Sequence, residues 1–190
     1  QGMANLVRMD APDRAPANPA APAAAAEADP EAASNSAYGA YQRGHYLEAF
    51  AAALPLAEKG EASAQTLLGV LYGGGLGVPQ NVVEAAGWYE LGAKSGDAAA
   101  QVAIGLAYLE GRGVTQDRSK AADYFEMAAA QDRPEALYNL GLLYLEGKVR
   151  ERDELKAAEF FSRAAGLGNA EAEYALASMY IEGNGVIQDD

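Results

Sequence analysis

The stretch AAAQVAIGLAYLEGRGVTQD at residues 98–117 returns 36 positions later as PEALYNLGLLYLEGKVRERD at residues 134–153. The tyrosine in each stretch belongs to a longer series with the same interval, which comprises Tyr72, Tyr108, Tyr144 and Tyr180. A fixed period of this length is typical of an array of one small unit, in which each unit packs on its neighbours. The sequence therefore predicts a repeat protein rather than a domain with one central core.

Three further series keep the same period and define the boundaries of the units. One glycine series comprises Gly69, Gly105 and Gly141, with Ala177 in the fourth place. A second comprises Gly75, Gly111, Gly147 and Gly183, and an amide or acid series comprises Asn81, Asp117, Asp153 and Asp189. We expect full units at residues 62–97, 98–133 and 134–169, a partial unit at 170–190, and a degenerate helix pair at 37–61.

Each unit is expected to contain two helices. In the second unit, Ala100, Ile104 and Tyr108 are spaced to lie on one helical face. Gly111 then breaks this helix, and Asp117 is placed to accept hydrogen bonds from the exposed amides of the next one. The buried stripe of that next helix is expected to comprise Ala121, Phe125, Ala128 and Ala129. The pattern predicts an all-α protein.

The mid-helix glycines indicate how the two helices of a unit pack. Glycine in a helix interior costs about 1 kcal/mol relative to alanine, yet Gly105 has a glycine counterpart in both neighbouring units. Close approach of the two helices would offset this cost, and the alanines of the second helix favour the same tight packing. We therefore expect a larger residue at position 105 to destabilise the protein by overpacking.

The composition argues against several classes of function. The 190 residues include no cysteine, so neither a disulfide nor a thiolate metal site can form within them. The net charge of −13 at pH 7 repels phosphate groups, so nucleic acid and anionic lipid are not expected as partners. No apolar run is long enough for a membrane-spanning helix, so direct membrane insertion is not expected.

Residues 1–36 differ in composition from the repeats. They hold five of the eight prolines and few bulky apolar residues, which favours a disordered or extended tether over a packed element. The first three residues, Gln1-Gly2-Met3, look like the remnant of a cleaved expression tag. Because a native targeting segment could precede such a remnant, the sequence leaves the compartment open.

The second unit resembles the SEL-one-like repeat, a relative of the tetratricopeptide repeat with a longer loop between its helices. The matching residues are Ala100, Ile104, Gly105, Tyr108, Gly111, Gly113, Val114, Asp117, Lys120, Ala121, Tyr124, Phe125, Ala128 and Ala129. The resemblance covers about Tyr38 to the C-terminus and implies a right-handed superhelical solenoid of antiparallel helix pairs. In such a solenoid the first helices line the concave face. The resemblance also implies a scaffold for protein complexes, which in bacteria often works in the cell envelope.

Two features depart from the family pattern. Some small bacterial members carry a disulfide in each repeat and have been linked to penicillin-binding or β-lactamase activity, and neither property carries over to a chain without cysteine. In the third unit, the loop after Gly147 lacks the second glycine and contains the basic residues Lys148, Arg150 and Arg152. We expect this loop to adopt a different conformation. The basic spot could attract an acidic partner segment, although ordinary solvation is the favoured interpretation.

The concave groove is the main candidate site for a partner. If Ile104, Gly105 and Tyr108 are buried, the groove face should carry exposed apolar side chains, which mark binding sites. The candidate residues are Val102, Leu106, Leu109, Tyr138, Asn139, Leu142, Leu145 and Tyr174. By resemblance to tetratricopeptide domains that clamp peptides, Asn139 would bond the backbone of the bound segment. The alternative is that some of these leucines only pack against the adjacent unit.

No pattern in the sequence indicates catalysis, a cofactor or a metal site. His45 is the only histidine, and with Glu48 it supplies only two ligands, so we expect it at a solvated helix start. No second base is available for a catalytic triad. The glycine-rich stretch at 73–77 follows no strand and precedes no Lys-Ser/Thr pair, so it is expected to form an inter-helix loop rather than a phosphate-binding loop.

The last unit is incomplete in the sequence. Asp189 occupies the position that starts the second helix in the other units, and the sequence ends at Asp190. The helix at residues 171–182 would then lack the partner that covers it elsewhere, whereas solenoids need a polar terminal cap. We expect a truncated array, with end-to-end self-association through the uncovered helix as the alternative.

These patterns favour a non-catalytic scaffold that binds a protein or peptide segment in its concave groove, in a bacterial cell-envelope or regulatory complex. Two alternatives stay open. The first is a unit that binds or hydrolyses peptidoglycan or another glycan, and the second is a structural spacer without a ligand. The expected location is the bacterial periplasm or cell envelope, with the cytoplasm as the alternative. The sequence does not specify the partner.

Overall fold

The computed structural model describes residues 30–183, and every regular element in this range is an α-helix. The helices are α1 (Pro30–Gln42), α2 (Tyr46–Glu58), α3 (Ala62–Gly74), α4 (Val82–Lys94), α5 (Ala98–Glu110), α6 (Arg118–Ala129), α7 (Pro134–Glu146), α8 (Glu154–Gly166) and α9 (Ala170–Glu182). The expected all-α architecture is confirmed. Most of the proposed tether, the tag remnant and the Asp189 cap lie outside the described residues.

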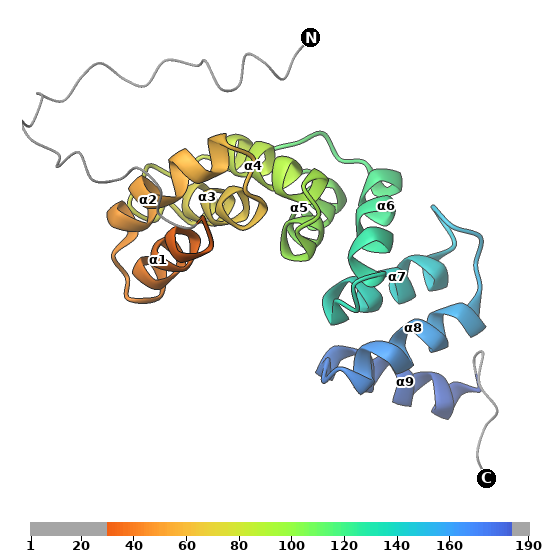
Figure 1. The fold of residues 1–190 in the computed structure, drawn as a ribbon. Coiled ribbons are helices and arrows are strands. Elements are labelled where there is room, and N and C mark those ends of the chain that lie inside the picture. Colours follow the sequence, from red (N-terminus) through yellow and green to blue (C-terminus); the bar gives the residue numbers. More distant parts are fainter. Residues whose placement is uncertain (1–29, 184–190) are drawn as a thin grey trace, which may run out of the picture.

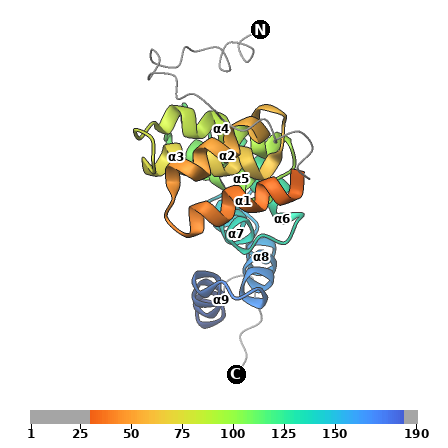
Figure 2. The ribbon, with the colours of Figure 1, turned by 60° about the vertical axis from the view of Figure 1, so that its left-hand side comes forward.

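Each helix packs on the one before it and the one after it, so the chain advances along a curved array. Figure 1 shows α2 and α4 along the upper side of the arc, with α1 and α5 below them. Figure 2 shows α8 and α9 below the other helices, at the C-terminal end of the array. The buried side chains form one cluster around α1–α3 and another from α4 to α9, as expected for a core that grows unit by unit.

The first helix begins earlier than the sequence suggested. We expected a tether through residue 36, but α1 begins at Pro30. Proline is favoured in the first turn of a helix because the amide that it lacks would have no helical partner there. The stretch EAASNSA at residues 31–37 contains no further proline, so nothing in it interrupts the helix.

The loops within the units begin and end on the periodic residues. Helices α3, α5, α7 and α9 end on glycines with φ of 63–75°, which are Gly75, Gly111, Gly147 and Gly183. Glycine adopts this left-handed conformation without the steric cost that a Cβ imposes. The following helices start after Asn81, Asp117 and Asp153, whose side chains accept hydrogen bonds from first-turn amides. The capping role is confirmed, but Gly73 and Gly74, expected in the loop, form the last turn of α3.

Two buried glutamines, Gln65 and Gln101, connect the first helix of their own unit to the end of the preceding helix. Gln101 is 2 % exposed, and its side-chain amide donates a hydrogen bond to the carbonyl of Ala93 at the end of α4 (3.2 Å). Its side-chain oxygen accepts one from Gln131 (3.0 Å). Gln65 donates in the same way to Ala57 at the end of α2 (3.1 Å). These buried amides are tolerated because they are hydrogen-bonded.

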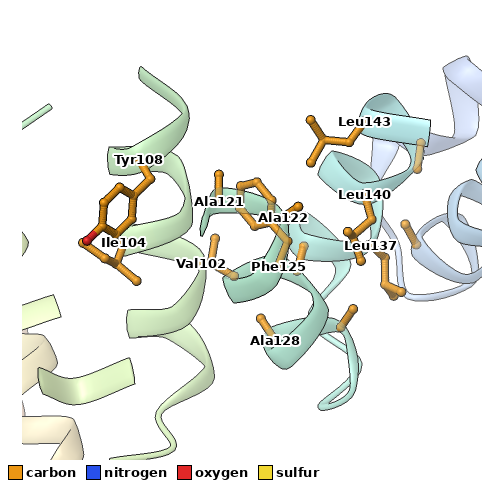
Figure 3. Close-up of a cluster of buried hydrophobic side chains, with 14 of the residues drawn as sticks. Val102, Ile104, Tyr108, Ala121, Ala122, Phe125, Ala128, Leu137, Leu140 and Leu143 are labelled. Atoms are coloured by element: carbon orange, nitrogen blue, oxygen red, sulfur yellow. The ribbon is translucent and has the colours of Figure 1, made fainter. Parts of the chain in front are cut away.

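The mid-helix glycines lie directly against an aromatic ring on the second helix of their own unit. A Cβ added to Gly105 would lie 2.7 Å from a ring carbon of Phe125, and one added to Gly141 would lie 2.5 Å from Phe161. Real Cβ atoms do not approach other atoms this closely. Figure 3 shows Phe125 in the middle of the buried cluster, between α5 and α7. The close approach of the two helices, predicted from the glycines, is confirmed.

Replacing Gly105 with leucine should lower the free energy of unfolding by about 1–3 kcal/mol, because the new side chain would overlap the Phe125 ring. Gly166, near the end of α8, offers a matched control because a Cβ there would meet nothing within 4 Å. Gly166→Leu should therefore cost nothing or stabilise slightly. Urea unfolding of both variants measures the difference, and equal stability of Gly105→Leu and the wild type would refute the packing scheme.

The third unit keeps the fold with a different loop. In the second unit, Gly113 has a φ of 73° and lies against the backbone of Val82, where a Cβ would come within 2.6 Å of the Val82 carbonyl carbon. The equivalent residue in the third unit is Val149, whose φ is not positive. There the Arg150 side chain fixes the loop by bonding two carboxylates of α6. The expected change of loop conformation is confirmed.

Candidate partner-binding groove

Val102 does not contribute to an exposed groove. Its side chain is 8 % exposed and belongs to the main buried cluster. The equivalent residue in the next unit, Tyr138, is half-buried, and its ring centre lies 5.7 Å from that of Phe161 on α8. This position faces the second helix of its own unit. The prediction of Val102 as a groove residue is therefore wrong, and Tyr138 has a packing role.

Tyr174 occupies the same position on α9 and is 78 % exposed. Ile181, two turns later, is 77 % exposed. The main packing partner of α9 among the described helices is α8, so the face that carries these side chains has no second helix of its own unit against it. Among the described residues, no second helix packs on this side of α9, which is why both side chains are exposed. A partner-binding role for Tyr174 stays a prediction.

Four predicted groove residues are leucines that are half-buried and pack against the main core with one side, namely Leu106, Leu109, Leu142 and Leu145. Each keeps part of its side chain in contact with solvent. Packing against the adjacent unit and contact with a partner are therefore compatible at these positions, so the two interpretations of the sequence do not exclude each other.

Asn139 is held along its own helix. Its side-chain amide donates a hydrogen bond to the carbonyl of Glu135, one turn earlier in α7 (2.8 Å). An asparagine amide has two donors and an oxygen acceptor, so this bond leaves capacity for a peptide backbone. The peptide-binding role inferred from the resemblance stays a prediction.

The basic spot is largely neutralised within the chain. Arg150 donates hydrogen bonds to Glu126 (3.0 Å) and Asp123 (2.8 Å) on α6, and these bonds raise the pKa of its guanidinium. Arg152 pairs with Glu154 at 2.7 Å. Arg150 therefore links the loop to the preceding unit, and we regard this spot as a weak candidate for binding an acidic segment.

A hollow of about 220 Å³ opens between α4 and α5. Its walls include Gly73 at the end of α3, Ala85 and Tyr89 on α4, and Ala103 and Leu106 on α5. Leu106 is therefore the predicted groove residue that reaches this hollow. The floor and walls are mostly apolar, which suits an apolar group of a ligand.

The hollow exists because small residues replace larger ones at two positions. Gly73 corresponds to Leu109 and Leu145 in the next two units. Ala103 corresponds to Asn139. Sequence periodicity alone does not single out Gly73, because the glycine-rich stretch at 73–77 predicts a loop. The signal that could have found the site is the loss of a leucine at one repeat position.

Polar groups surround the mouth of the hollow. Arg112 Nη1 lies 3.5 Å from Glu110 Oε2, and both side chains are exposed. Burial raises the pKa of the Tyr89 hydroxyl, Tyr41 adds to the rise, and Arg112 opposes it. The hydroxyl is therefore protonated at neutral pH and able to donate a hydrogen bond. No hydrogen bond of this hydroxyl is found within residues 30–183.

A periodic aromatic stack lies outside the hollow and was not predicted from the sequence. The ring centres of Tyr108 and Tyr124 are 5.9 Å apart, and Lys120 Nζ lies 5.1 Å above the Tyr108 ring. Burial and the nearby Glu90 carboxylate raise the pKa of Tyr124 to about 12. The next unit repeats the arrangement with Tyr144, Phe160 and Lys156. These contacts stabilise the end of each first helix against its second helix.

No cluster of three His, Asp or Glu side chains that could hold a metal ion is found between residues 30 and 183. His45 is exposed, and its Nδ1 lies 3.2 Å from Glu48 Oε2. This places it at the start of α2, as expected from the sequence. None of the helices described by the structure is sufficiently long and apolar to cross a membrane.

Comparison with known families identifies the repeat. The family model described as the Sel1 repeat matches residues 62–97, 98–132, 134–169 and 170–190. These segments cover more than half of the chain. A search of the curated proteins finds no significant match.

Solved structures from three bacteria are similar to this chain. One is a protective antigen present in uropathogenic Escherichia coli strains that displays an SLR fold, with 34% identity over 85% of this chain and a TM-score of 0.79. A Sel1 repeat protein from Oxalobacter formigenes shows 31% identity over 82% of this chain and a TM-score of 0.77. The chain spans 36% of the first and 64% of the second.

A putative Sel1 repeat protein from Klebsiella pneumoniae subsp. pneumoniae shares the fold at 23% identity and a TM-score of 0.59. The match covers 85% of this chain and 80% of that protein. At this identity the likeness concerns the fold alone.

Proposed function

Because the chain belongs to the Sel1 repeat family, we propose that it is a scaffold that binds a segment of a partner protein in a groove along its first helices. Members of this family generally mediate protein–protein interaction and are generally non-catalytic. The observation that carries the proposal is the apolar hollow between α4 and α5, which is open to solvent. Apolar surface that stays exposed next to a packed core is typical of an interaction site.

The half-buried leucines extend the apolar surface beyond the hollow. Leu106 lines the hollow, and Leu142 occupies the equivalent position one unit later. Their inner sides pack on the core, so the outer sides are held in place before a partner arrives. A surface that is ordered in advance loses less entropy on binding, which favours affinity.

Affinity capture from a lysate of the source organism tests the groove. The bait is the full chain, and the groove variant carries Leu106→Ala, Asn139→Ala and Leu142→Ala. We expect the wild type to retain a protein that the groove variant loses by about tenfold or more, because truncating central interface residues removes most of the binding energy. Quantitative mass spectrometry of the eluates measures the loss.

A second variant controls for loss of apolar surface in general. Met127→Ala and Leu167→Ala remove side chains that are 44% and 50% exposed and that do not line the hollow. This variant should capture the same protein as the wild type. Circular dichroism and melting temperatures confirm that both variants are folded. Equal capture by the wild type and a folded groove variant would contradict partner binding in the groove. The chain would then be interpreted as a structural spacer without a ligand.

We also propose a bacterial cell-envelope setting for this scaffold. The support is the resemblance to envelope-associated repeat proteins, together with the relative that is a protective antigen of uropathogenic Escherichia coli. Fractionation of cells that express the native protein should place it outside the cytoplasm. Recovery with cytoplasmic markers alone would refute this part of the proposal.

A further inference from the structure

We propose that the hollow between α4 and α5 anchors one apolar side chain of the partner, the size of leucine or phenylalanine, with a lysine or arginine beside it. This inference rests on the proposed function and adds the chemistry of the bound segment. Four observations support it. They are the size of the hollow, the glycine at position 73 that keeps it open, the Tyr89 hydroxyl beside it, and the Glu110 carboxylate at the mouth of the hollow.

The size of the hollow favours a single side chain. Pockets for cofactors and drug-sized molecules typically have volumes of about 300–1,000 Å³, whereas this hollow has about 220 Å³. Ala85, Ala103 and Leu106 give it apolar walls. Removing an apolar side chain from water in such a site is favourable in proportion to the area that becomes buried. A leucine or phenylalanine side chain therefore suits the hollow better than a polar one.

Packing does not require the glycine that keeps the hollow open. A Cβ at Gly73 would lie 3.5 Å from the Ala85 Cβ and 3.7 Å from the Tyr89 hydroxyl, which are ordinary contact distances. Gly69, one turn earlier in α3, differs because a Cβ there would come within 2.5 Å of the Tyr89 ring. Glycine near the end of a helix also carries an entropic cost. Gly73 therefore provides space without a packing need, as expected of a binding pocket.

The aromatic residue beside the hollow differs in the same unit. Position 89 is a tyrosine, whereas the equivalents Phe125 and Phe161 have no hydroxyl. These phenylalanines occur in the units that carry leucine in place of Gly73. A Cβ at Gly73 would lie 3.7 Å from the Tyr89 hydroxyl, so this hydroxyl borders the space that a side chain at position 73 would fill. Because it makes no hydrogen bond within the described residues, it can donate one to a backbone carbonyl of a bound segment.

Glu110 at the mouth, where Arg112 also lies, and the acidic charge of the whole chain together favour a basic neighbour for the anchoring side chain. Glu110 contacts only Arg112 there, at 3.5 Å, and their side chains are 50% and 66% exposed. Such an exposed pair contributes little to stability, so a partner's lysine or arginine can pair with Glu110 at small cost. The net charge of −13 on the whole chain also attracts basic segments and repels acidic ones.

A peptide library tests the inference with a defined probe. Random 12-residue peptides displayed on phage are selected on the full chain, and the enriched peptides are synthesised and titrated by fluorescence polarisation. We expect them to share a leucine, methionine or aromatic residue next to lysine or arginine. Gly73→Leu should weaken their binding about tenfold to a hundredfold, because it fills the space that the side chain occupies. Glu110→Gln should weaken it less, and the loss should diminish at high salt.

Two controls keep the result interpretable. The variant Gly73→Leu with Tyr89→Phe reproduces the residue pair of the next two units, so it should fold and melt no lower than the wild type. It should bind as weakly as Gly73→Leu. The double variant Asn139→Ala, Leu142→Ala changes two residues that do not line the hollow. It therefore measures how much the rest of the groove contributes to binding.

The possible outcomes separate this inference from the proposed function. Peptides that bind the wild type and Gly73→Leu equally, but lose affinity for Asn139→Ala with Leu142→Ala, would overturn the anchoring pocket and leave the groove intact. Enrichment of acidic peptides would overturn the prediction that a lysine or arginine lies next to the anchoring side chain. Failure to enrich any peptide, together with identical capture by the wild type and the groove variant, would overturn both proposals.

Discussion

Replacing Phe125 with alanine should lower the free energy of unfolding by about 3–5 kcal/mol. The side chain is fully buried in the middle of the main cluster, between α5 and α7. Its ring fills the space that Gly105 leaves on α5, so its removal opens a cavity between the two helices. Neighbouring backbone cannot easily close this cavity, because α6 also packs on α7. Urea unfolding, monitored by helicity, measures the loss.

Met127→Ala on the same helix is the control for this prediction. Met127 is 44% exposed, so its truncation should cost far less than that of Phe125. A repeat array can unfold in parts, so the slope of the transition is compared as well as its midpoint. If the two variants lost similar amounts of unfolding free energy, the claim that glycine–aromatic contacts hold each unit together would be contradicted.

The second large effect is expected at Gly113, for which alanine should cost about 2–5 kcal/mol. Part of this cost comes from the left-handed backbone, since φ is 73° and a Cβ in that conformation costs about 1–2 kcal/mol. The rest, about 1–3 kcal/mol, comes from overlap with the backbone of Val82, which cannot move like a flexible side chain. Thermal unfolding of Gly113→Ala measures the total.

Gly44→Ala separates the two contributions to this cost. Gly44 has a φ of 78°, close to that of Gly113, but a Cβ there would meet nothing within 4 Å. Its replacement should therefore show the backbone cost alone, about 1–2 kcal/mol. If the two alanine variants were equally stable, the close approach of the loop to α4 would not contribute to the fold.

The repeat period was sufficient to predict the helix pair of each full unit and the residues that cap its helices, whereas the start of α1 and the last turn of α3 differ from the expectation. Asp117 recurs because a side-chain acceptor is needed before each second helix, and Gly111 recurs because the first helix ends in a left-handed residue. Gly105 recurs because Phe125 occupies the space of its missing side chain. Each of these local requirements involves residues of a single unit. A regular pattern in the sequence therefore translates directly into structure.

The predicted groove was less accurate because it depends on contacts between helices. Val102 is spaced like an exposed residue of α5, yet it lies in the main buried cluster, because helices contact α5 on more than one side. Gln101 is polar but buried, because the end of α4 offers a carbonyl acceptor. Helical periodicity predicts one buried face of a helix. A helix inside an array has at least two buried faces, because helices pack on it from both sides.

Departures from the period have two different consequences in the structure. Val149 replaces a loop glycine, and the structure compensates with the ion pairs of Arg150 to α6. Gly73 replaces a leucine, and the structure leaves a hollow. The first departure maintains packing, while the second gives up packing that the neighbouring units retain. Only the coordinates distinguish these two cases.

Site-specific photo-crosslinking in the source organism tests the central claim, partner binding in the groove, most directly. A benzophenone side chain is placed at Leu106, which lines the hollow, or at Met127, which does not. We expect a discrete crosslinked protein from position 106, none from position 127, and loss of the crosslink when Gly73→Leu is added. Crosslinks to one protein from position 127 alone, or no difference between the two positions, would contradict it.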